Sequence, residues 1–268
     1  MDNSVLIRNH VKISGVGVQP MIFAHGFGCD QQMWRAVVPF FEQQYKVITF
    51  DYAGHGNSQI SSYNPERYSS LYGYAQDLIE IIAELNLSDV IFVGHSVSSM
   101  IGMLASIQNP ASFSRLIMVG PSPSYLNDGD YQGGFERSDI IELLETMSRN
   151  YIGWSNFIAP EIMGNKDRPE LGDELTNSFC STDPLIARQF AEVTFLSDNR
   201  NDLSKSTVPA LILQCSNDMI APETVGLYLS KNLPNSTIYY MKASGHCPHV
   251  SAPDETVELI RQYLSKLN

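Results

Sequence analysis

The apolar run Val90-Ile91-Phe92-Val93 is followed directly by Gly94-His95-Ser96-Val97-Ser98. The run is typical of a buried strand, and the glycine after it indicates a tight turn. A buried strand that ends in such a turn before a helix places a serine hydroxyl on a sharp, exposed elbow. Because a serine hydroxyl is a weak nucleophile at neutral pH, Ser96 needs a base within hydrogen-bond reach. The pattern therefore predicts an α/β fold with a nucleophilic serine and a base elsewhere in the chain.

Candidates for the base and its partner follow Ser96 in the chain. Asp218 comes after the apolar run 210–215, and His246 comes after the strand-like residues 237–241. In an open α/β sheet, catalytic groups gather at the carboxyl ends of the strands, and the order serine, acid, histidine suits this kind of elbow. We predict that Ser96 attacks an acyl carbon and that His246 takes its proton and returns it to the leaving group. Asp218 would fix the imidazole tautomer and stabilise the imidazolium.

The elbow departs from the usual pattern at Ser98, where glycine normally stands because the helix backbone comes close to the strand. We expect serine to fit there because it is small. Ser96 on its own could also be a helix N-cap after a strand. That alternative is weakened by Asp218 and His246, which follow strands in the right order.

Acyl transfer also needs hydrogen-bond donors for the oxyanion. One donor should be the backbone N–H of Val97, directly after the nucleophile. The second should come from the loop His25-Gly26-Phe27-Gly28, where the N–H of Phe27 is the candidate. The two glycines of this loop let the backbone bend and approach a substrate closely.

Strand-like and helical patterns alternate along the chain, which predicts a mainly parallel, doubly wound sheet. We expect strands at residues 5–13, 21–24, 47–50, 90–93, 116–119, 210–215 and 237–241, and helices at 65–87, after Ser96 and at 254–267. Between residues 122 and 206 the pattern is helical and is interrupted by prolines. We therefore predict a core domain, 1–122 and 201–268, with a helical lid at 123–200. Some apolar side chains of such a lid must line a pocket over the nucleophile.

Composition excludes several classes of partner and compartment. The net charge of −12 argues against binding to nucleic acid or to an anionic membrane, since both are polyanions. No stretch approaches the ~20 apolar residues of a membrane span. The N-terminal residues lack a basic segment followed by an apolar one, so we expect no secretory signal. The four cysteines show no CxxC spacing. We predict a cytoplasmic protein with reduced thiols.

No cofactor or metal site is predicted. His249 lies three residues after His246, but no carboxylate or cysteine cluster accompanies the pair at metal-ligand spacing. Residues 54–58 lack the third glycine and the lysine of phosphate-binding loops. His25, His55 and His95 stand beside glycines, and we expect them to be hydrogen-bonded structural residues rather than catalysts.

Several sequence strings resemble the RsbQ-like family of α/β-hydrolases, which regulate the general stress sigma factor of bacteria. They are His25-Gly26-Phe27-Gly28-Cys29-Asp30-Gln31, Gly94-His95-Ser96-Val97, Met118-Val119-Gly120-Pro121-Ser122-Pro123, Gly245-His246-Cys247-Pro248-His249, Asn150-Tyr151-Ile152-Gly153-Trp154 and Asp183-Pro184-Leu185-Ile186-Ala187-Arg188-Gln189-Phe190. The resemblance covers essentially the whole chain. Ser98 is instead similar to the elbow of the plant karrikin and strigolactone receptors, which belong to the same wider family. Both branches therefore stay open.

The resemblance implies an α/β-hydrolase fold and a slow serine hydrolase for a small hydrophobic ester, lactone or butenolide-like molecule. It implies catalytic roles for Ser96, Asp218 and His246, with Phe27 and Val97 at the oxyanion hole, and no cofactor. It also implies signalling through a PAS-domain serine phosphatase. The positions that match pocket-lining residues of the family are Phe135, Leu143, Ile158, Phe179, Val193 and Phe195.

Two functions remain. The first is an esterase or lactonase. The second is a ligand-sensing receptor in which slow hydrolysis changes the lid and triggers partner binding. Dehalogenases and epoxide hydrolases are disfavoured because they carry a carboxylate at the elbow, where this chain has Ser96. A cofactor-free perhydrolase and a carbon–carbon bond hydrolase stay open because they also use serine.

Overall fold

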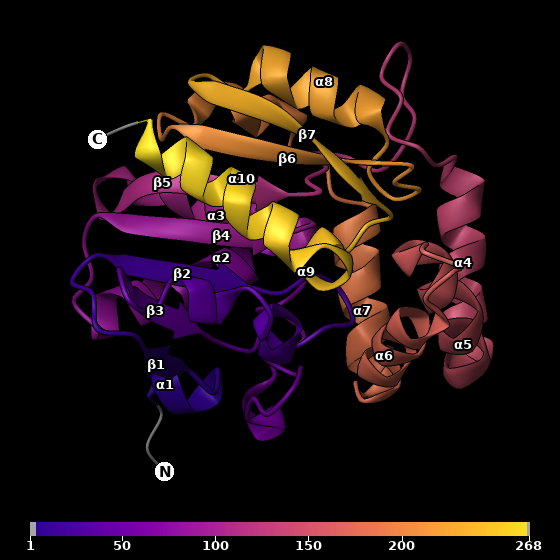
Figure 1. Cartoon of the computed structure of the whole chain (residues 1–268). Helices are drawn as coiled ribbons and strands as arrows, with labels where there is room; N and C mark the ends of the chain where they lie inside the picture. Colours follow the sequence, from indigo (N-terminus) through magenta and orange to yellow (C-terminus); the bar gives the residue numbers. More distant parts are fainter. Residues whose placement is uncertain (1–3, 267–268) are drawn as a thin grey trace.

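The computed structural model describes residues 4–266, which form a seven-stranded sheet (Figure 1). The strand order is β1-β3-β2-β4-β5-β6-β7, and every neighbouring pair is parallel except β1 with β3. The predicted α/β class with a mainly parallel sheet is confirmed. The strands are β1 (Lys12–Ser14), β2 (Pro20–Ala24), β3 (Lys46–Thr49), β4 (Val90–His95), β5 (Phe113–Val119), β6 (Ala210–Ser216) and β7 (Ser236–Ser244).

Helices cover both faces of the sheet, because its central strands carry apolar side chains on both faces. Along β4, Phe92 packs into one core with side chains of α2, α3 and α8, while Val93 packs into a second core with side chains of α10. Figure 1 shows α10 in front of the sheet and α2 and α3 behind it. These helices are α2 (Leu71–Glu84), α3 (Val97–Gln108), α8 (Glu223–Asn232) and α10 (Pro253–Ser265), with the short α1 (Val5–Arg8) and α9 (Pro248–Ser251). Short 3-10 helices are η1 (Gln31–Trp34), η2 (Val38–Phe40), η3 (Ile60–Ser62), η4 (Pro110–Ser112) and η5 (Arg200–Lys205).

The predicted strand at residues 5–13 is wrong in its first half. Val5–Arg8 forms helix α1, and only Lys12–Ser14 forms a strand, at the edge of the sheet. The hydroxyl of Ser4 accepts a hydrogen bond from the backbone N–H of Leu6 at 3.2 Å, and Val5 is buried. A short apolar run has no period that separates helix from strand, so this cap and the burial of Val5 decide the structure.

Two helix boundaries also differ from the prediction. Helix α2 begins at Leu71 rather than near residue 65. The side chain of Asn64 accepts hydrogen bonds from the backbone N–H groups of Glu66 and Arg67 at 2.9 and 3.3 Å, and such local bonds compete with helix formation. The last helix ends at Ser265, and the predicted apolar position Leu267 lies outside the described residues.

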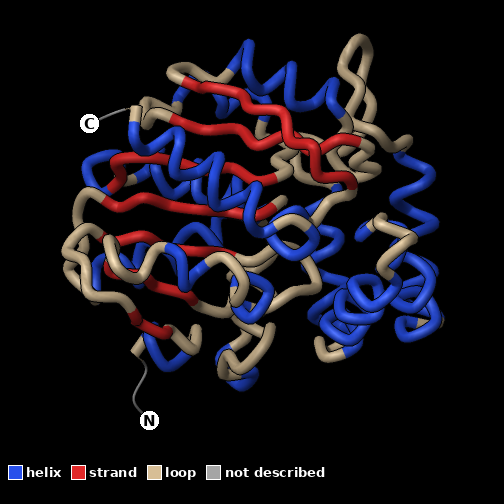
Figure 2. Tube along the Cα trace, viewed as in Figure 1, coloured by secondary structure: helices blue, strands red, loops and turns tan. Residues whose placement is uncertain are grey.

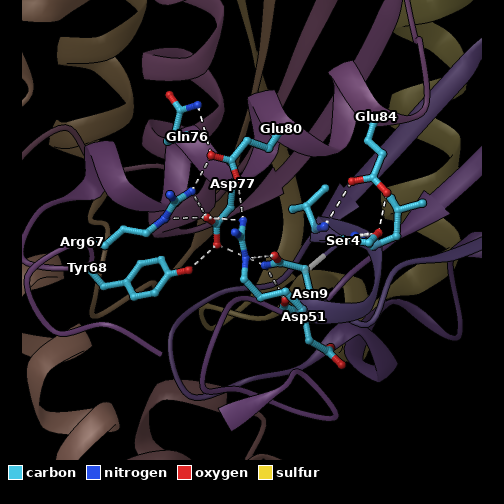
Figure 3. A network of polar contacts seen from close by, with 12 residues as sticks. Ser4, Asn9, Asp51, Arg67, Tyr68, Gln76, Asp77, Glu80 and Glu84 are labelled. Carbon is cyan, nitrogen blue, oxygen red and sulfur yellow. Dashed lines mark hydrogen bonds and ion pairs between the residues drawn. The ribbon is translucent and has the colours of Figure 1, made fainter. Parts of the chain in front are cut away.

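A buried polar network ties the N-terminal segment to α2 (Figure 3). The side chain of Asp77 is fully buried. Asn9, which donates to it, also donates to the backbone carbonyl of Asp51 at 3.1 Å, in the loop after β3. Two guanidinium groups compensate the buried carboxylate, as burial of a charge requires. The partners of Asp77 are Arg8 at 2.8 Å, Arg67 at 2.6 Å, Tyr68 at 2.9 Å and Asn9 at 3.2 Å.

Four α-helices lie between β5 and β6 in the sequence and pack on one another beyond one end of the sheet (Figure 2). They are α4 (Arg137–Arg149), α5 (Tyr151–Met163), α6 (Pro169–Cys180) and α7 (Pro184–Phe195), and we call residues 137–195 the helical insertion. Their apolar side chains form most of a third core. The division of the chain into a core domain and a lid at 123–200 stays a prediction. No helix within residues 4–266 combines the length and apolar character that crossing a membrane requires.

Candidate active site

The site is built around a strained turn between β4 and α3. Ser96 stands between the two elements with φ 56° and ψ −122°, a backbone conformation that L residues rarely adopt. Its N–H donates to the carbonyl of Val119 at the end of β5, at 2.8 Å. A Cβ on Gly94 would lie 2.7 Å from the backbone of Ser98, so glycine is required at that position. This tight elbow holds the Ser96 hydroxyl at the carboxyl end of the sheet.

The structure brings Ser96, His246 and Asp218 together in a hydrogen-bonded chain. Ser96 Oγ lies 2.8 Å from His246 Nε2, and His246 Nδ1 lies 2.8 Å from Asp218 Oδ2. All three residues are buried. With the carboxylate as acceptor, Nδ1 carries the imidazole proton, which leaves Nε2 free to accept the proton of the serine hydroxyl. This is the arrangement that activates a serine nucleophile.

Backbone groups hold the acid and the base of this chain in place. Asp218 follows β6 by two residues, and its Oδ1 accepts hydrogen bonds from the N–H groups of Ile220 and Ala221 at 2.9 and 3.0 Å. The backbone N–H of His246 donates to the carbonyl of Ile162 in α5, and its carbonyl accepts a hydrogen bond from His95 Nε2. The acid and the base are therefore pre-positioned before any ligand binds.

The two predicted oxyanion donors come from the start of α3 and from the loop after β2. Val97 is the first residue of α3, and Phe27 lies in the loop after β2. Neither backbone N–H donates a hydrogen bond to another group within residues 4–266. Unsatisfied N–H groups at the start of a helix and in a glycine-flanked turn are suited to bind a developing negative charge.

A small, mainly apolar cavity lies over Ser96 and His246. It is partly open and has a volume of about 20 Å³, so a ligand larger than a water molecule has to displace lining side chains. Polar groups are few: Tyr125 presents its hydroxyl 3.5 Å from Ser96 Oγ, and burial raises the pKa of this phenol, so that it stays protonated. The lining residues are Phe27, Cys29, His95, Ser96, Tyr125, Ile162, Leu175, Phe179, Thr194, Phe195, Ile220, His246 and Cys247.

Of the six pocket positions taken from the resemblance, Phe179 and Phe195 line this cavity and four do not. Three of those four, Phe135, Leu143 and Ile158, pack against the third core from outside. The fourth, Val193, packs against the first core. The side chains of an inserted helix are divided between its cavity face and the faces that meet neighbouring helices, and residue type does not distinguish these faces.

Sequence reasoning missed several lining residues, and a signal was available for two of them. Tyr125 follows the end of β5, and Ile220 follows the catalytic aspartate candidate after β6, so both lie where strands end. The rule that groups at carboxyl strand ends meet would have included them. Leu175 and Thr194 belong to the insertion and carried no such signal.

The remaining histidines take structural positions. The ring of His25 accepts a hydrogen bond from the backbone N–H of Tyr52 at 3.1 Å. His249 packs its ring on Trp34, with 4.4 Å between ring centroids, and burial lowers its pKa to about 3. Within residues 4–266, no group of three or more histidine, cysteine or acidic side chains is placed to hold a metal ion.

Comparison with known proteins agrees with this geometry. Karrikin insensitive 2 receptor CA of Petunia hybrida is 40% identical over 257 residues, which cover 96% of this chain and 95% of that protein. Strigolactone esterase RMS3 of Pisum sativum is 37% identical over 268 residues, which cover 99% of this chain and 100% of that protein. A hydrolase structure from Oleispira antarctica superposes with a TM-score of 0.95 at 45% identity, covering 97% of this chain and 96% of that one.

A family model matches most of the chain. The model described as "Alpha/beta hydrolase family" matches residues 21–259, a span that runs from β2 into α10. That span includes the elbow serine and the acid and histidine that follow it. The predicted α/β-hydrolase fold is therefore confirmed, and the chain belongs to the alpha/beta hydrolase family.

Proposed function

We propose that this protein is a serine hydrolase that cleaves a small, apolar ester or lactone. The observation that carries the proposal is the unbroken chain from Ser96 through His246 to Asp218, with both hydrogen bonds at 2.8 Å, beside a mainly apolar cavity. A buried nucleophile, base and acid in this order have few structural uses and a well-defined chemical one.

The reaction would proceed in two halves. Ser96 Oγ attacks the carbonyl carbon while His246 Nε2 takes its proton, and the backbone N–H groups of Phe27 and Val97 stabilise the resulting oxyanion. His246 then donates the proton to the leaving oxygen as the carbon–oxygen bond breaks, which leaves an acyl group on Ser96. Water, deprotonated by the same histidine, attacks that ester; as the bond to Ser96 Oγ breaks, His246 returns the proton to this oxygen and the acid leaves. Asp218 keeps the imidazole oriented in both halves.

The cavity and the relatives support a small lactone or butenolide-like substrate. The walls are mainly aromatic and aliphatic, and the hydroxyl of Tyr125 and the ring of His246 lie close to Ser96. Relatives named as karrikin receptors and strigolactone esterases span almost the whole chain at 35–40% identity. We further propose that the helical insertion acts as a lid over this cavity. A cytoplasmic location stays a prediction from the sequence.

Mass spectrometry of the intact protein tests the proposal directly. Wild type and Ser96→Ala are mixed with p-nitrophenyl acetate and, separately, with a small butenolide, and the mass and the product are followed over time. We expect a transient acyl adduct on wild type only, and a rate that falls about a thousandfold or more in the variant. Equal rates in the two proteins, or no product with either compound, would contradict the assignment of Ser96.

A signalling function is the second candidate, and the relatives named as receptors favour it. In this reading hydrolysis is slow, and ligand capture changes the surface of the helical insertion that a partner recognises. The RsbQ-like strings support one type of partner, a PAS-domain serine phosphatase, and with it a role in stress signalling.

The lifetime of the adduct and the protease sensitivity of the helical insertion separate the two functions. A persistent adduct, especially one on His246, together with a ligand-dependent change in proteolysis of the helical insertion, would support the receptor. Rapid turnover with no change in proteolysis, and no ligand-dependent complex with a PAS-domain phosphatase, would leave the enzyme alone.

A further inference from the structure

Ser98, the residue that departs from the usual elbow, is hydrogen bonded across the molecule. Its side chain is fully buried, and Oγ donates to the backbone carbonyl of His25. The hydroxyl of Tyr52 lies 2.8 Å from the same Oγ. Serine therefore fits in place of glycine, as expected, and its hydroxyl bonds to the carbonyl of His25 and the hydroxyl of Tyr52. With a glycine at position 98, the carbonyl of His25 would lose this donor.

The side chain of His25 also fixes the loop after β2. The backbone N–H of Tyr52 donates to His25 Nε2 at 3.1 Å, so the proton of this imidazole resides on Nδ1, which donates to the carbonyl of Gly26 at 2.9 Å. Burial lowers the pKa of His25 and keeps its ring neutral. A Cβ on Gly26 would lie 2.4 Å from His95 Nδ1, so the loop already packs closely against the residue before the nucleophile.

We propose that Ser98 and Tyr52 are positioning residues for the oxyanion hole. The inference rests on the proposed function, because it concerns the backbone donors at Phe27 and Val97. By fixing the carbonyl of His25, the Ser98 hydroxyl fixes the chain two residues before the Phe27 N–H. Glycines on both sides of Phe27 would otherwise leave that N–H free to turn.

One helical turn then controls both donors. Val97 supplies one N–H as the first residue of α3, and the next residue, Ser98, holds the loop that supplies the other. The distance between two donors decides how well they stabilise an oxyanion, and misplacing a donor costs part of the roughly 10²–10³-fold that a single donor contributes. Ser98 therefore acts on the rate of acyl transfer through Phe27, without touching the substrate.

The test compares two buried serines of α3. Ser98→Ala removes the hydroxyl that donates to the carbonyl of His25. Ser106→Ala is the matched control, because the Ser106 hydroxyl is also buried but donates to the carbonyl of Met103 within the helix, at 2.8 Å. Tyr52→Phe removes only the second partner and serves if Ser98→Ala does not fold. The readouts are kcat and KM for p-nitrophenyl acetate, thermal stability, and inhibition by a small trifluoromethyl ketone, which binds serine as an oxyanion.

We expect Ser98→Ala to lower kcat about 10- to 100-fold with KM within about twofold, and to weaken the ketone in proportion. Tyr52→Phe should lower kcat by a smaller factor, and Ser106→Ala should leave kcat unchanged. Ser98→Ala with kcat within twofold of wild type, while wild type clearly exceeds Ser96→Ala, overturns the inference alone. Wild type that does not exceed Ser96→Ala overturns the inference together with the proposed function.

Discussion

The walls of the cavity come from two regions that contribute different chemistry. The loops after the strands of the sheet supply Ser96 and His246, and Asp218 holds His246 by a hydrogen bond from behind the wall. The helical insertion contributes Ile162, Leu175, Phe179, Thr194 and Phe195, of which only Thr194 carries a polar group. The insertion also contains no histidine, so all six histidines lie outside residues 137–195.

This difference separates two properties of the site. In the proposed reaction the strand ends set the chemistry, because they hold every group that moves a proton. In the same proposal the insertion sets which acyl groups fit, because the side chains it lends to the cavity are almost all apolar and distinguish molecules by size and shape. Substitutions in the two regions should therefore change different measured quantities, and the expected effects below run from the largest to the smallest.

The largest effect is expected for Asp218→Asn. The amide retains an oxygen for the N–H groups of Ile220 and Ala221, but it disfavours the imidazole tautomer that carries its proton on Nδ1. We expect kcat for p-nitrophenyl acetate to fall about 10³- to 10⁴-fold with little change in KM. Steady-state kinetics measures both values. A loss of kcat below tenfold would contradict the proposed role of Asp218 in the reaction.

A second prediction asks whether stability and chemistry are separable within the core. Asp77→Ala leaves the guanidinium groups of Arg8 and Arg67 without their shared buried carboxylate. We expect the free energy of unfolding to fall by about 3–5 kcal/mol, measured by urea denaturation, because one partner of a buried ion pair has been removed. The kcat of the folded protein at low temperature should stay near that of wild type.

Glu80 provides the control for that prediction. It pairs with the same two arginines, but its side chain is 31% exposed. Glu80→Gln should cost about 1 kcal/mol or less, as exposed ion pairs do. Equal losses of unfolding free energy in the two variants would show that burial of Asp77 does not determine how much this network stabilises the fold.

A third prediction concerns the insertion. Phe195 lines the cavity and packs edge to face on Tyr125, with 5.1 Å between ring centroids. Phe195→Ala should enlarge the cavity and raise the ratio of kcat/KM for p-nitrophenyl octanoate over acetate about tenfold or more, since each added methylene in an apolar pocket contributes about 1–3 kcal/mol. Phe157→Ala, at a residue of the same insertion that is 73% exposed, should leave the ratio unchanged. A shift of equal size in both variants would contradict the proposed specificity role.

The sequence predicts the loops at the strand ends better than it predicts the helical insertion. Ser96, Asp218 and His246 each follow an apolar run, and the topology of a parallel sheet brings such positions to one edge, so their meeting could be predicted without a structure. The fold class followed from the alternation of strands and helices. The hydroxyl pairing of Ser98 with the carbonyl of His25 could not be predicted, because it depends on how α3 lies against a loop far away in the sequence.

The insertion was harder because periodicity shows that a helix has an apolar face but not what covers that face. Leu143 and Ile158 are as apolar as Phe179, yet they pack against neighbouring helices while Phe179 reaches the cavity. The predicted strand at Val5–Arg8 is a helix for a related reason. Four residues are too few to show a period, and the N-cap at Ser4 decides the structure.

The smallest effect near neutral pH is expected from mild acid, and it should arise outside the insertion. Burial lowers the pKa values of His55 and His249 to about 3. Both rings therefore stay neutral in the folded protein down to that pH, whereas in the unfolded chain they take up protons below pH 6.5. Between about pH 6.5 and 3 the unfolded chain binds more protons, so stability falls as the pH falls and is fully present above 6.5. Each histidine should contribute up to about 1.4 kcal/mol per pH unit.

His249→Phe isolates one of these contributions. The ring nitrogens of His249 have no hydrogen-bond partner within residues 4–266, and phenylalanine keeps the contact with Trp34. The variant should match wild type or exceed it in unfolding free energy at pH 7.5, and it should lose less stability between pH 6 and 4. Urea denaturation at several pH values measures both slopes. Parallel slopes would show that His249 protonates in the folded state, and would then place the acid sensitivity elsewhere in the molecule.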